Sequence, residues 1–466
     1  MSVRLAVSGL VTATGGRLLV PAGVSAATHI TGVATDSRAV RPGDAFVALR
    51  GPRTDGHRFV TDAMTRGAAL AVISDADAAA GPALVVADTL RALGQIAGLH
   101  RRTLSLDVVG ITGSVGKTTT VGLCAQVLAQ RFVTARSAES WNAEIGVALT
   151  LLGLQPSHQV AVLEMAMRGT GQLTELVGMA LPRIGAVTNI ADVHLETLGS
   201  RERIAAAKAE LLSGLPTDGV AIVNADDPFA PRLVRDVRCR VVQFGTWADA
   251  DVRATEITSS AAGCRFVLHL GSDCAEAAMP VVGAHHVLNA LVAASVGWVL
   301  GESLAEIVGG LAKARVAKMR QEISTLENDV LLIDDSYNAG PRSMEAAFDV
   351  LRQVGGTRRR VLILGEMLEL GVESAVFHRQ AGEQAAALAP AAMLVVGPNA
   401  RWYLEGATRG SQAVVATAWA RTPHEAIPLV RDIVRPGDVV LVKGSRGIEM
   451  EHVVAALRGR AVGTPR

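Results

Sequence analysis

The chain has few aromatic residues and almost no net charge. Aromatic residues make up 3% of its 466 residues, whereas hydrophobic residues make up 49%. Its cores must therefore be built from Ala, Val, Leu and Ile, a composition typical of buried parallel strands covered by helices. With 45 basic and 44 acidic residues, the formal charge is +1. This balance favours neither nucleic acid nor an anionic membrane as a partner, so any anion must bind at a local site.

Cysteine is also scarce, and long apolar runs are missing. The four cysteines contain no CxxC pair and are scattered along the chain, which is typical of buried small residues rather than of a disulfide framework. The longest uncharged stretch, 277–301, is interrupted by proline and histidine, and only 290–300 is continuously near-apolar. That length suits a core helix. Since the N-terminus has no signal-peptide pattern either, we expect a cytoplasmic protein without membrane insertion.

Strand and helix patterns divide the chain into three α/β regions. A chain of 466 residues holds about three domains at roughly 150 residues each. The expected strands are 45–49, 69–73 and 84–87, then 108–112, 160–164, 184–188 and 220–224, and finally 330–334, 361–365, 393–397 and 439–443. A charged, irregular segment at 312–322 separates the last group. We therefore expect domains at 1–86, 87–316 and 317–466, with a doubly wound parallel sheet in the middle one.

A glycine-rich turn, Gly113-Ser-Val-Gly-Lys-Thr-Thr-Thr120, follows strand 108–112 and precedes an expected helix. Backbone N–H groups in such a turn bind phosphate, Lys117 can reach the β- and γ-phosphates, and Thr118 can ligate Mg²⁺. The turn departs from the strict Walker form, because Ile111 stands where that form has its first glycine. The alternative, a tight turn with an exposed lysine, is disfavoured by the strand before and the helix after. The turn predicts nucleotide binding and leaves hydrolysis, transfer and sensing open.

Acidic, histidine and lysine residues follow the neighbouring strands. Glu164 ends strand 160–164, at the edge where ligands bind in open α/β sheets. The next strand leads to His194, and an expected helix at 201–212 carries Lys208. Taken singly, His194 is more typical of a hydrogen-bonded loop residue and Lys208 of a solvated helix residue. Residue type alone therefore assigns neither of them a role.

Taken together, these motifs resemble those of the Mur ligase family. The runs that carry the resemblance are Gly113–Thr120, Asn142–Gly146, Glu164–Met165, Thr188–Ile190, His194–Glu196, Ala207–Leu211, Asn224–Pro228, Gly283–Ala290, Asp334–Ala339, Gly365–Gly371 and Val442–Arg446. Near the N-terminus, Thr35–Arg38, Pro42–Asp44 and Asp55–His57 resemble the UDP-sugar domain of that family. The resemblance covers nearly the whole chain. It implies a small N-terminal α/β UDP-binding domain, a central P-loop ATPase domain with a parallel sheet, and a C-terminal Rossmann-like domain that binds the acceptor.

Within the family, the motifs resemble the member that adds D-alanyl-D-alanine to UDP-N-acetylmuramoyl-tripeptide. The Asp-Asn-Pro-Arg motif of the diaminopimelate- or lysine-adding member is missing. The resemblance implies that ATP phosphorylates the terminal carboxylate of the tripeptide, and that the dipeptide amine attacks the resulting acyl phosphate. Alternatives are a ligase of the same superfamily with another acceptor, including a folylpolyglutamate-type synthetase, and a non-catalytic nucleotide-binding protein. The UDP-sugar motifs disfavour the folate enzyme, and the presence of Glu164, His194 and Lys208 disfavours the non-catalytic protein.

The resemblance also implies roles for individual residues. The implied Mg²⁺ ligands are Thr118, Glu164, His194 and a carbamylated Lys208. The implied ATP contacts are Gly113, Ser114, Gly116, Lys117, Thr118, Thr119, Asn289 with His285 nearby, Arg320 and Asp335. The implied substrate contacts are Ser37, Arg38, Asn142, Thr188, Asn189, Lys443 and Arg446. Lys117, Glu164, His194 and Lys208 would be the catalytic set.

The residues implied as contacts in the first and last domains could also have no role in binding. Arg320 and Asp335 could be ordinary surface charges, and Ser37 with Arg38 could form a plain polar turn. The residues around Lys443 could simply cap the helix expected from residue 449. The functional interpretation requires the last domain to close on the middle one about a hinge at 312–322. We expect a monomer.

Overall fold

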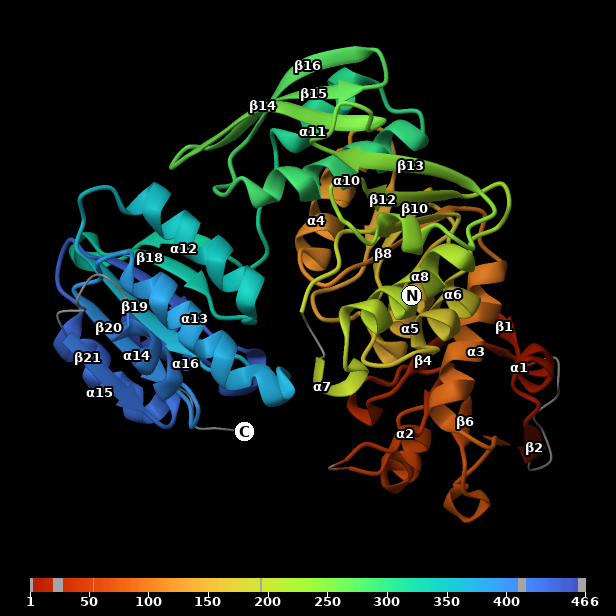
Figure 1. The fold of residues 1–466 in the computed structure, drawn as a ribbon. Helices are drawn as coiled ribbons and strands as arrows, with labels where there is room; N and C mark the ends of the chain where they lie inside the picture. The colour runs from red at the N-terminus through yellow and green to blue at the C-terminus, as the bar shows by residue number, and fades with distance from the viewer. Residues whose placement is uncertain (1–2, 20–27, 53, 193–194, 410–415, 460–466) are drawn as a thin grey trace.

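The computed structural model of the chain describes residues 3–19, 28–52, 54–192, 195–409 and 416–459. These residues form three α/β regions, each with a β-sheet of its own (Figure 1). The middle region contacts both of the others, which lie on different sides of it (Figure 1). Within the described ranges, no helix combines the length and the apolar character needed to cross a membrane. The predicted three-part α/β architecture is confirmed.

The first region contains a small sheet covered by short helices. Its strands are β1 (Leu5–Ala6), β2 (Arg17–Leu19), β3 (His29–Ile30), β4 (Gly32–Ala34), β5 (Asp44–Val47), β6 (Leu70–Ile73) and β7 (Ala83–Val85), and its helices are α1 (Val7–Thr14) and α2 (Val60–Thr65). Strands β1 and β3 form a separate antiparallel pair. The order of the main sheet is β2-β7-β6-β5-β4, in which only β2 runs antiparallel to its neighbour. The strands β5, β6 and β7 are those expected from the sequence.

Helix α3 (Thr89–Arg102) joins the first region to the second. It begins where the Asp88 carboxylate accepts hydrogen bonds from the backbone N–H groups of Leu90 and Arg91, which otherwise lack partners at a helix N-terminus. One stripe of the helix, including Leu93 and Ile96, is buried. Because α3 contacts α1 of the first region as well as helices of the second, its apolar stripe connects the two regions.

The middle region is built on a nine-stranded sheet. Its strands are β8 (Asp107–Thr112), β9 (Thr134–Arg136), β10 (Val160–Glu164), β11 (Ile184–Val187), β12 (Val220–Asn224), β13 (Arg240–Gly245), β14 (Val252–Ser260), β15 (Gly263–Leu270) and β16 (Asp273–Met279). Its helices are α4 (Lys117–Leu128), α5 (Glu144–Leu152), α6 (Gln172–Ala180), α7 (Leu195–Leu198), α8 (Arg201–Ser213), α9 (Ala230–Leu233), α10 (His285–Val299) and α11 (Leu304–Leu311). The sheet order is β16-β15-β14-β13-β12-β11-β8-β10-β9.

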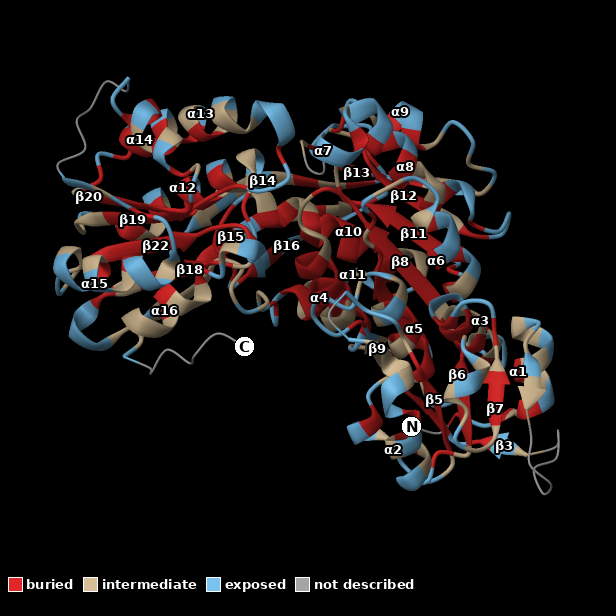
Figure 2. Ribbon diagram, turned by 90° about the horizontal axis from the view of Figure 1, so that it is seen from below, coloured by how far each residue is buried: buried red, intermediate tan, exposed pale blue. Residues whose placement is uncertain are grey.

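Alternating side chains of the central strands pack into two separate cores. Val109 and Ile111 of β8 join the core formed with α4, α10 and α11. Val108 of the same strand joins the core formed with α3, α5, α6 and α8, because successive side chains of a strand point to opposite faces. The strands therefore appear as buried ribbons between layers of helices (Figure 2). This two-sided burial explains the continuous apolar runs in the sequence.

The order of these strands brings the loops that carry the predicted site residues to one edge of the sheet. Strand β8 lies between β10 and β11, and all three run parallel. Glu164 at the end of β10 pairs with Ile111, and Val187 at the end of β11 pairs with Thr112. The loops that follow β8, β10 and β11 therefore leave the sheet side by side, as expected for a ligand site in an open α/β sheet.

Strands β13 to β16 are not anticipated by the sequence analysis. The last three of them form an antiparallel meander at the end of the sheet. In β14, residues after Ala254 alternate between half-buried and exposed positions, so this part of the strand buries one face only weakly. Such a strand lacks the strong apolar run that marks β8 or β10, and its pattern was missed.

The last region contains a six-stranded sheet with helices on both faces. Its strands are β17 (Glu322–Thr325), β18 (Leu331–Asp335), β19 (Arg360–Gly365), β20 (Ala392–Val396), β21 (Ala416–Ala420) and β22 (Val439–Lys443). Its helices are α12 (Pro341–Gly355), α13 (Ser374–Ala386), α14 (Arg401–Ala407), α15 (Pro423–Ile433) and α16 (Glu451–Leu457). The order is β17-β18-β22-β19-β20-β21, and only β17 is antiparallel. Helix α16 begins at Glu451, two residues after the expected start, because residues 446–448 form a separate 3₁₀ turn.

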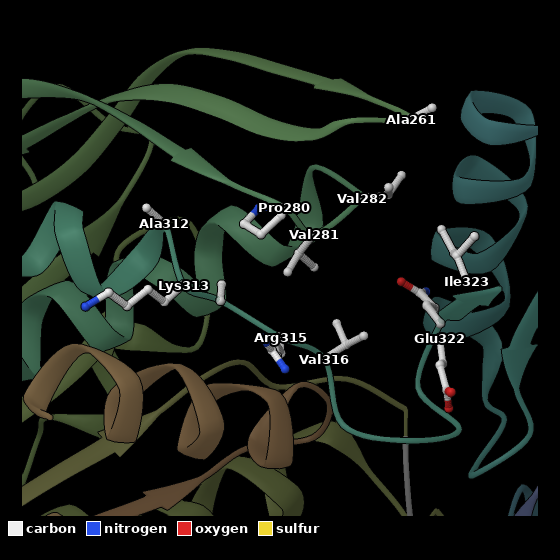
Figure 3. A pocket seen from close by; sticks show the side chains of 12 residues that line it. Ala261, Pro280, Val281, Val282, Ala312, Lys313, Arg315, Val316, Glu322 and Ile323 are labelled. Atoms are coloured by element: carbon white, nitrogen blue, oxygen red, sulfur yellow. The ribbon is translucent and has the colours of Figure 1, made fainter.

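The linker between the middle and last regions runs from the end of α11 at Leu311 to the start of β17 at Glu322. It forms one wall of a hollow of about 550 Å³, lined mostly by aliphatic side chains including Pro280 and Val316 (Figure 3). Met319 has a φ of 61°, a left-handed conformation that glycine adopts more easily. The linker therefore keeps its bend at a conformational cost.

The buried carboxyl group of Glu302 makes the stability of the folded protein depend on pH. Its side chain is 3% exposed, and neither carboxylate oxygen has a hydrogen-bond partner within the described part of the chain. Burial, helped by the charge of Glu306, raises the pKa of Glu302 from 4.5 to about 7. The folded protein therefore binds a proton that the unfolded chain releases, and stability falls as the pH rises from about 4.5 to 7.

We expect the Glu302→Gln variant to be more stable than the wild type at pH 8, by up to about 3 kcal/mol, and equally stable near pH 4.5. Denaturant unfolding between pH 4.5 and pH 8 measures this difference. Glu276 is exposed, so Glu276→Gln serves as the matched control and should track the wild type throughout. A constant difference between Glu302→Gln and the wild type across this pH range would contradict the prediction.

Candidate active site

The glycine-rich turn after β8 leads directly into α4, as predicted. Gly113 and Gly116 have φ values of 149° and 84°, which residues other than glycine rarely adopt. A Cβ atom on Gly113 would lie 1.9 Å from the Thr188 hydroxyl oxygen. The turn therefore needs glycine for both its conformation and its packing. Its position at the N-terminus of α4 directs unpaired backbone N–H groups to where an anion would bind.

Residues after β11 form hydrogen bonds with the glycine-rich turn. The Thr188 hydroxyl donates to the Val115 carbonyl oxygen at 2.7 Å, and the Asn189 side chain both donates to that oxygen and accepts from the Val115 N–H, each at 3.1 Å. The Ser114 hydroxyl bonds in turn to the backbone of Ala191. Thr188, Asn189 and Ser114 thus fix the shape of the turn in this structure. Direct substrate contacts of Thr188 and Asn189 remain a prediction.

Two lysine side chains converge on one carbonyl oxygen of the turn. Lys117 Nζ donates to the Gly113 oxygen at 2.8 Å, and Lys208 Nζ donates to the same oxygen at 3.0 Å. The interpretation of Lys208 as a solvated helix residue is wrong, because only 2% of it is exposed. Burial, and then the charge of Lys117, lower the pKa of Lys208 well below its usual value. Burial also lowers the pKa of Lys117.

The carboxylate of Glu164 lies beside the first turn of α4. It accepts a hydrogen bond from the Thr118 hydroxyl at 2.6 Å and one from the Asn142 side-chain amide at 2.8 Å. Its own backbone N–H donates to the Ser137 hydroxyl at 3.0 Å. The structure therefore brings Thr118 and Glu164 together, as expected, and places Asn142 beside them. Ser137 was missed, since a serine after a short strand carries no distinctive pattern.

The oxygen atoms of Thr118 and Glu164 are hard ligands of the kind that Mg²⁺ prefers. Within the described residues, no group of three or more His, Cys, Asp or Glu side chains is placed to hold a metal. The nearby Lys208 could supply oxygen to a metal only after carbamylation. His194, the remaining predicted ligand, lies outside the described residues.

Helix α10 contributes Asn289 to the same site. Its side-chain oxygen accepts a hydrogen bond from the Thr120 hydroxyl at 3.3 Å, and its nitrogen lies 3.4 Å from His286 Nδ1. A Cβ atom on Gly116 would lie 2.4 Å from the Asn289 oxygen. The structure thus places Asn289 directly against the phosphate turn. Thr119 is buried in the first turn of α4.

This contact predicts the effect of a small substitution. The Gly116→Ala variant must strain a φ of 84° and displace Asn289, at a cost of about 1–3 kcal/mol. We expect weaker binding of ATP by about tenfold or more, measured by calorimetric titration. Gly178 lies in α6 with no atom within 4 Å of an added Cβ, and Gly178→Ala is the matched control. Equal affinities of the two variants for ATP would contradict the account.

A second group of charged residues comes from the last region. The Lys443 ammonium donates to the Asp335 carboxylate at 2.7 Å and to the Asn338 carbonyl oxygen at 2.8 Å. Both charged side chains are buried, so the alternative that Asp335 is a surface charge is wrong. Burial raises the pKa of Asp335, and the charge of Lys443 opposes that rise. The pair lies where β18 and β22 end side by side.

The charge of Arg320 acts on both groups. Burial is the main cause of the lowered pKa of Lys117 and of the raised pKa of Asp335, and the positive charge of Arg320 adds a smaller lowering effect at each. A further link joins the regions, because His286 Nε2 lies 3.1 Å from the Gln321 side-chain oxygen. Burial lowers the pKa of His286 to about 4, so this imidazole is neutral at pH 7. The last region thus approaches the phosphate turn in this structure.

The predicted substrate contacts Arg38, in the first region, and Arg446, in the last region, form ion pairs within their own regions. Arg38 is 82% exposed and pairs with Asp36, whose carboxylate also accepts from the Arg38 backbone N–H. Hydrogen bonds from the side chain and the backbone N–H of Arg38 accordingly lower the pKa of Asp36 to about 2. Ser37 is buried beside this turn in the first region. Arg446 pairs with Glu451 at the start of α16. Roles of Ser37, Arg38 and Arg446 in substrate binding remain predictions.

Three family models match successive parts of the chain. The model of the "Mur ligase family, catalytic domain" matches residues 29–101, that of the "Mur ligase middle domain" matches 111–297, and that of the "Mur ligase, glutamate ligase domain" matches 319–446. Together they cover all three regions of the structure.

Curated relatives and solved structures agree with these models. The chain is 33% identical over 434 residues to UDP-N-acetylmuramoyl-tripeptide--D-alanyl-D-alanine ligase of Bacillus subtilis, with 92% of this chain and 93% of the relative covered. It is similar to a crystal structure of MurF from Acinetobacter baumannii, with a TM-score of 0.89, 34% identity, and 98% and 100% coverage. It is also similar to MurF ligase from Thermotoga maritima in complex with ADP, with a TM-score of 0.81, 26% identity, and 92% and 97% coverage. The chain belongs to the Mur ligase family.

Proposed function

We propose that this chain is an ATP-dependent ligase that joins D-alanyl-D-alanine to UDP-N-acetylmuramoyl-tripeptide and releases ADP and phosphate. The observation that carries the proposal is the convergence of Lys117 and Lys208 on Gly113 next to the Glu164–Thr118 pair. This arrangement suits transfer of a phosphoryl group to a carboxylate, because the Lys117 cation and a metal held by Thr118 and Glu164 would offset two approaching anions. The relatives whose names specify this tripeptide and dipeptide support the choice of substrates.

The nucleotide would bind at the turn 113–119. The T. maritima relative was solved with ADP, and the turn of this chain offers the N-terminus of α4 and Lys117 for the phosphates. Asn289 and His285 would lie toward the nucleoside, and Arg320 and Asp335 would approach from the last region. Arg320 supports this assignment, because its positive charge contributes to the lowered pKa of Lys117.

Thr118 and Glu164 would hold one Mg²⁺, and His194 with a carbamylated Lys208 would hold a second. The lowered pKa of Lys208 favours this modification, because a neutral amine can attack CO₂ whereas an ammonium cannot. The carbamate would replace a cation by an anionic oxygen ligand. Bound Mg²⁺ would supply positive charge to the phosphoryl oxygens.

Different residues of the chain would then act in phosphoryl transfer and in substrate binding. Lys117 stabilises the γ-phosphoryl group while a tripeptide carboxylate oxygen attacks phosphorus, and ADP leaves. The dipeptide amine attacks the carbonyl carbon of the acyl phosphate, loses a proton, and expels phosphate as the C–O bond breaks. Closure of the last region excludes water, which would otherwise hydrolyse the acyl phosphate. Lys443 and Arg446 would bind the dipeptide, and Ser37, Arg38, Asn142, Thr188 and Asn189 would contact the UDP-linked substrate.

The proposal includes the domain limits 1–86, 87–316 and 317–466, a monomeric state, and a cytoplasmic location, where ATP is available. The sheets support the domain limits, since β7 ends at Val85 and β17 begins at Glu322. A second candidate, a ligase of the same superfamily with another acceptor, would keep the ATP chemistry and change the acceptor.

Phosphate release tests the proposal. The enzyme would be mixed with ATP, Mg²⁺ and UDP-N-acetylmuramoyl-tripeptide, with D-alanyl-D-alanine, D-alanine or buffer as the third component. We expect turnover only with the dipeptide. Turnover with a single amino acid would favour the second candidate. Phosphate release that depends on neither the tripeptide nor the dipeptide would rule out a ligase.

A further inference from the structure

A single tyrosine of the last region reaches the middle region at the edge of the site. The Tyr337 hydroxyl lies 2.8 Å from the Ser140 hydroxyl, so the two groups share a hydrogen bond. Ser140 belongs to the segment between β9 and α5, whereas Tyr337 follows β18. This hydrogen bond spans the junction that must close for the two halves of the site to meet.

The ring of Tyr337 makes a second contact. The Arg320 guanidinium carbon lies 3.8 Å from the centroid of this ring, within the range of a cation–π interaction. The Tyr337 backbone N–H also donates to the Met319 carbonyl oxygen at 3.1 Å. Tyr337 therefore fixes both the side chain of Arg320 and the backbone that precedes it. Without the ring, a long arginine side chain would sample many rotamers.

The Ser140 side of the bridge leads to the predicted metal ligand. Asn142, two residues after Ser140, donates to Glu164 at 2.8 Å, and Ser137 at the start of the same segment accepts from the Glu164 backbone. A hydrogen bond that holds Ser140 therefore restrains the segment that orients Glu164. One tyrosine thus connects Arg320 on one side of the site with Glu164 on the other.

We infer that Tyr337 is a positioning residue, which aligns Arg320 and the Ser140 segment across the junction between the middle and last regions. This inference rests on the proposed function, and it adds a residue to which the sequence analysis assigns no role. It predicts that the hydroxyl and the ring of Tyr337 act separately. The hydroxyl holds the two regions together, and the ring holds Arg320.

Two conservative variants separate these contributions. Tyr337→Phe keeps the ring and removes the interdomain hydrogen bond, and Ser140→Ala removes the same bond from the other side. A hydrogen bond contributes about 0.5–1.5 kcal/mol, so each variant should lower kcat by about threefold to tenfold while the melting temperature stays near that of the wild type. Because both remove one interaction, the double variant should lose no more than either single one. Tyr337→Leu should lose a further threefold to tenfold, by about the energy of a cation–π contact.

The chain offers a matched control in Tyr403, its other tyrosine. The Tyr403 hydroxyl donates to the Gly365 carbonyl oxygen at 3.2 Å inside the last region. The effects of Tyr403→Phe and Ser140→Ala should therefore multiply. If the effects of Tyr337→Phe and Ser140→Ala multiply as well, or if neither variant changes kcat, the inference is wrong.

A measurement without turnover separates this inference from the proposed function. Small-angle X-ray scattering of the unliganded proteins should give the same increased radius of gyration for Tyr337→Phe and Ser140→Ala, and the wild-type value for Tyr403→Phe. A wild-type radius for both bridge variants would overturn the claim that the bond holds the regions together. If the wild type lacks ligase activity, the proposed function fails whereas this scattering result still decides whether the bridge exists.

Discussion

The Lys117→Ala variant is expected to lose about 10³-fold in kcat, because the phosphoryl group would then lose the buried cation nearest to its developing charge. Lys117 already donates to two carbonyl oxygens of the phosphate turn, those of Gly113 and Ser114. Its ammonium is therefore aimed at the turn. Steady-state phosphate release with saturating dipeptide measures the loss.

Lys313 provides the control for this experiment. It is exposed at the end of α11, where its ammonium donates to the Gln130 side chain, and the account gives it no part in the reaction. Lys313→Ala should keep the wild-type kcat. If Lys117→Ala retained more than about a tenth of the wild-type rate, the turn would not be the site of phosphoryl transfer.

Removal of the Lys208 side chain is expected to lower kcat by at least about 100-fold, since a metal ligand would be lost. The Lys208→Arg variant should be equally inactive, because a guanidinium does not form a carbamate. In addition, wild-type enzyme depleted of CO₂ and bicarbonate should lose activity and regain it when bicarbonate is added. Rate measurements before and after the addition, with mass spectrometry of the intact protein, test the modification.

Two results would contradict the role given to Lys208. Substantial activity of Lys208→Arg would show that a cation is sufficient at this position. Activity that is unchanged in carefully degassed buffer, with no added mass on Lys208, would show that the free amine is the working form.

The sequence predicted the part of the site that is formed by strand ends. Glu164 and Thr188 follow short apolar runs, and the parallel order of the sheet then brings them to the same edge as the glycine-rich turn. Strands that are buried on both faces carry an apolar run that is easy to recognise. For the same reason, the predicted ends of β10, β12 and β22 agree with the structure.

Features that depend on packing between distant segments were not predicted. Lys208 lies on a helix whose sequence is compatible with exposure, and its burial follows from the position of α8 against the phosphate turn. The Tyr337 bridge requires two regions nearly 200 residues apart to meet, as the separation of 197 residues from Ser140 shows. Strand β14 buries too little of one face after Ala254 to give a clear pattern.

Mass spectrometry of a single reaction tests the central claim most directly. UDP-N-acetylmuramoyl-tripeptide labelled with ¹⁸O in its terminal carboxylate would be incubated with ATP, Mg²⁺, D-alanyl-D-alanine and the enzyme. The account predicts a product heavier by one dipeptide minus one oxygen atom and two hydrogen atoms, with one ¹⁸O retained in the new amide and the other transferred to the released phosphate. Unlabelled phosphate, or a tripeptide of unchanged mass after ATP is consumed, would contradict it.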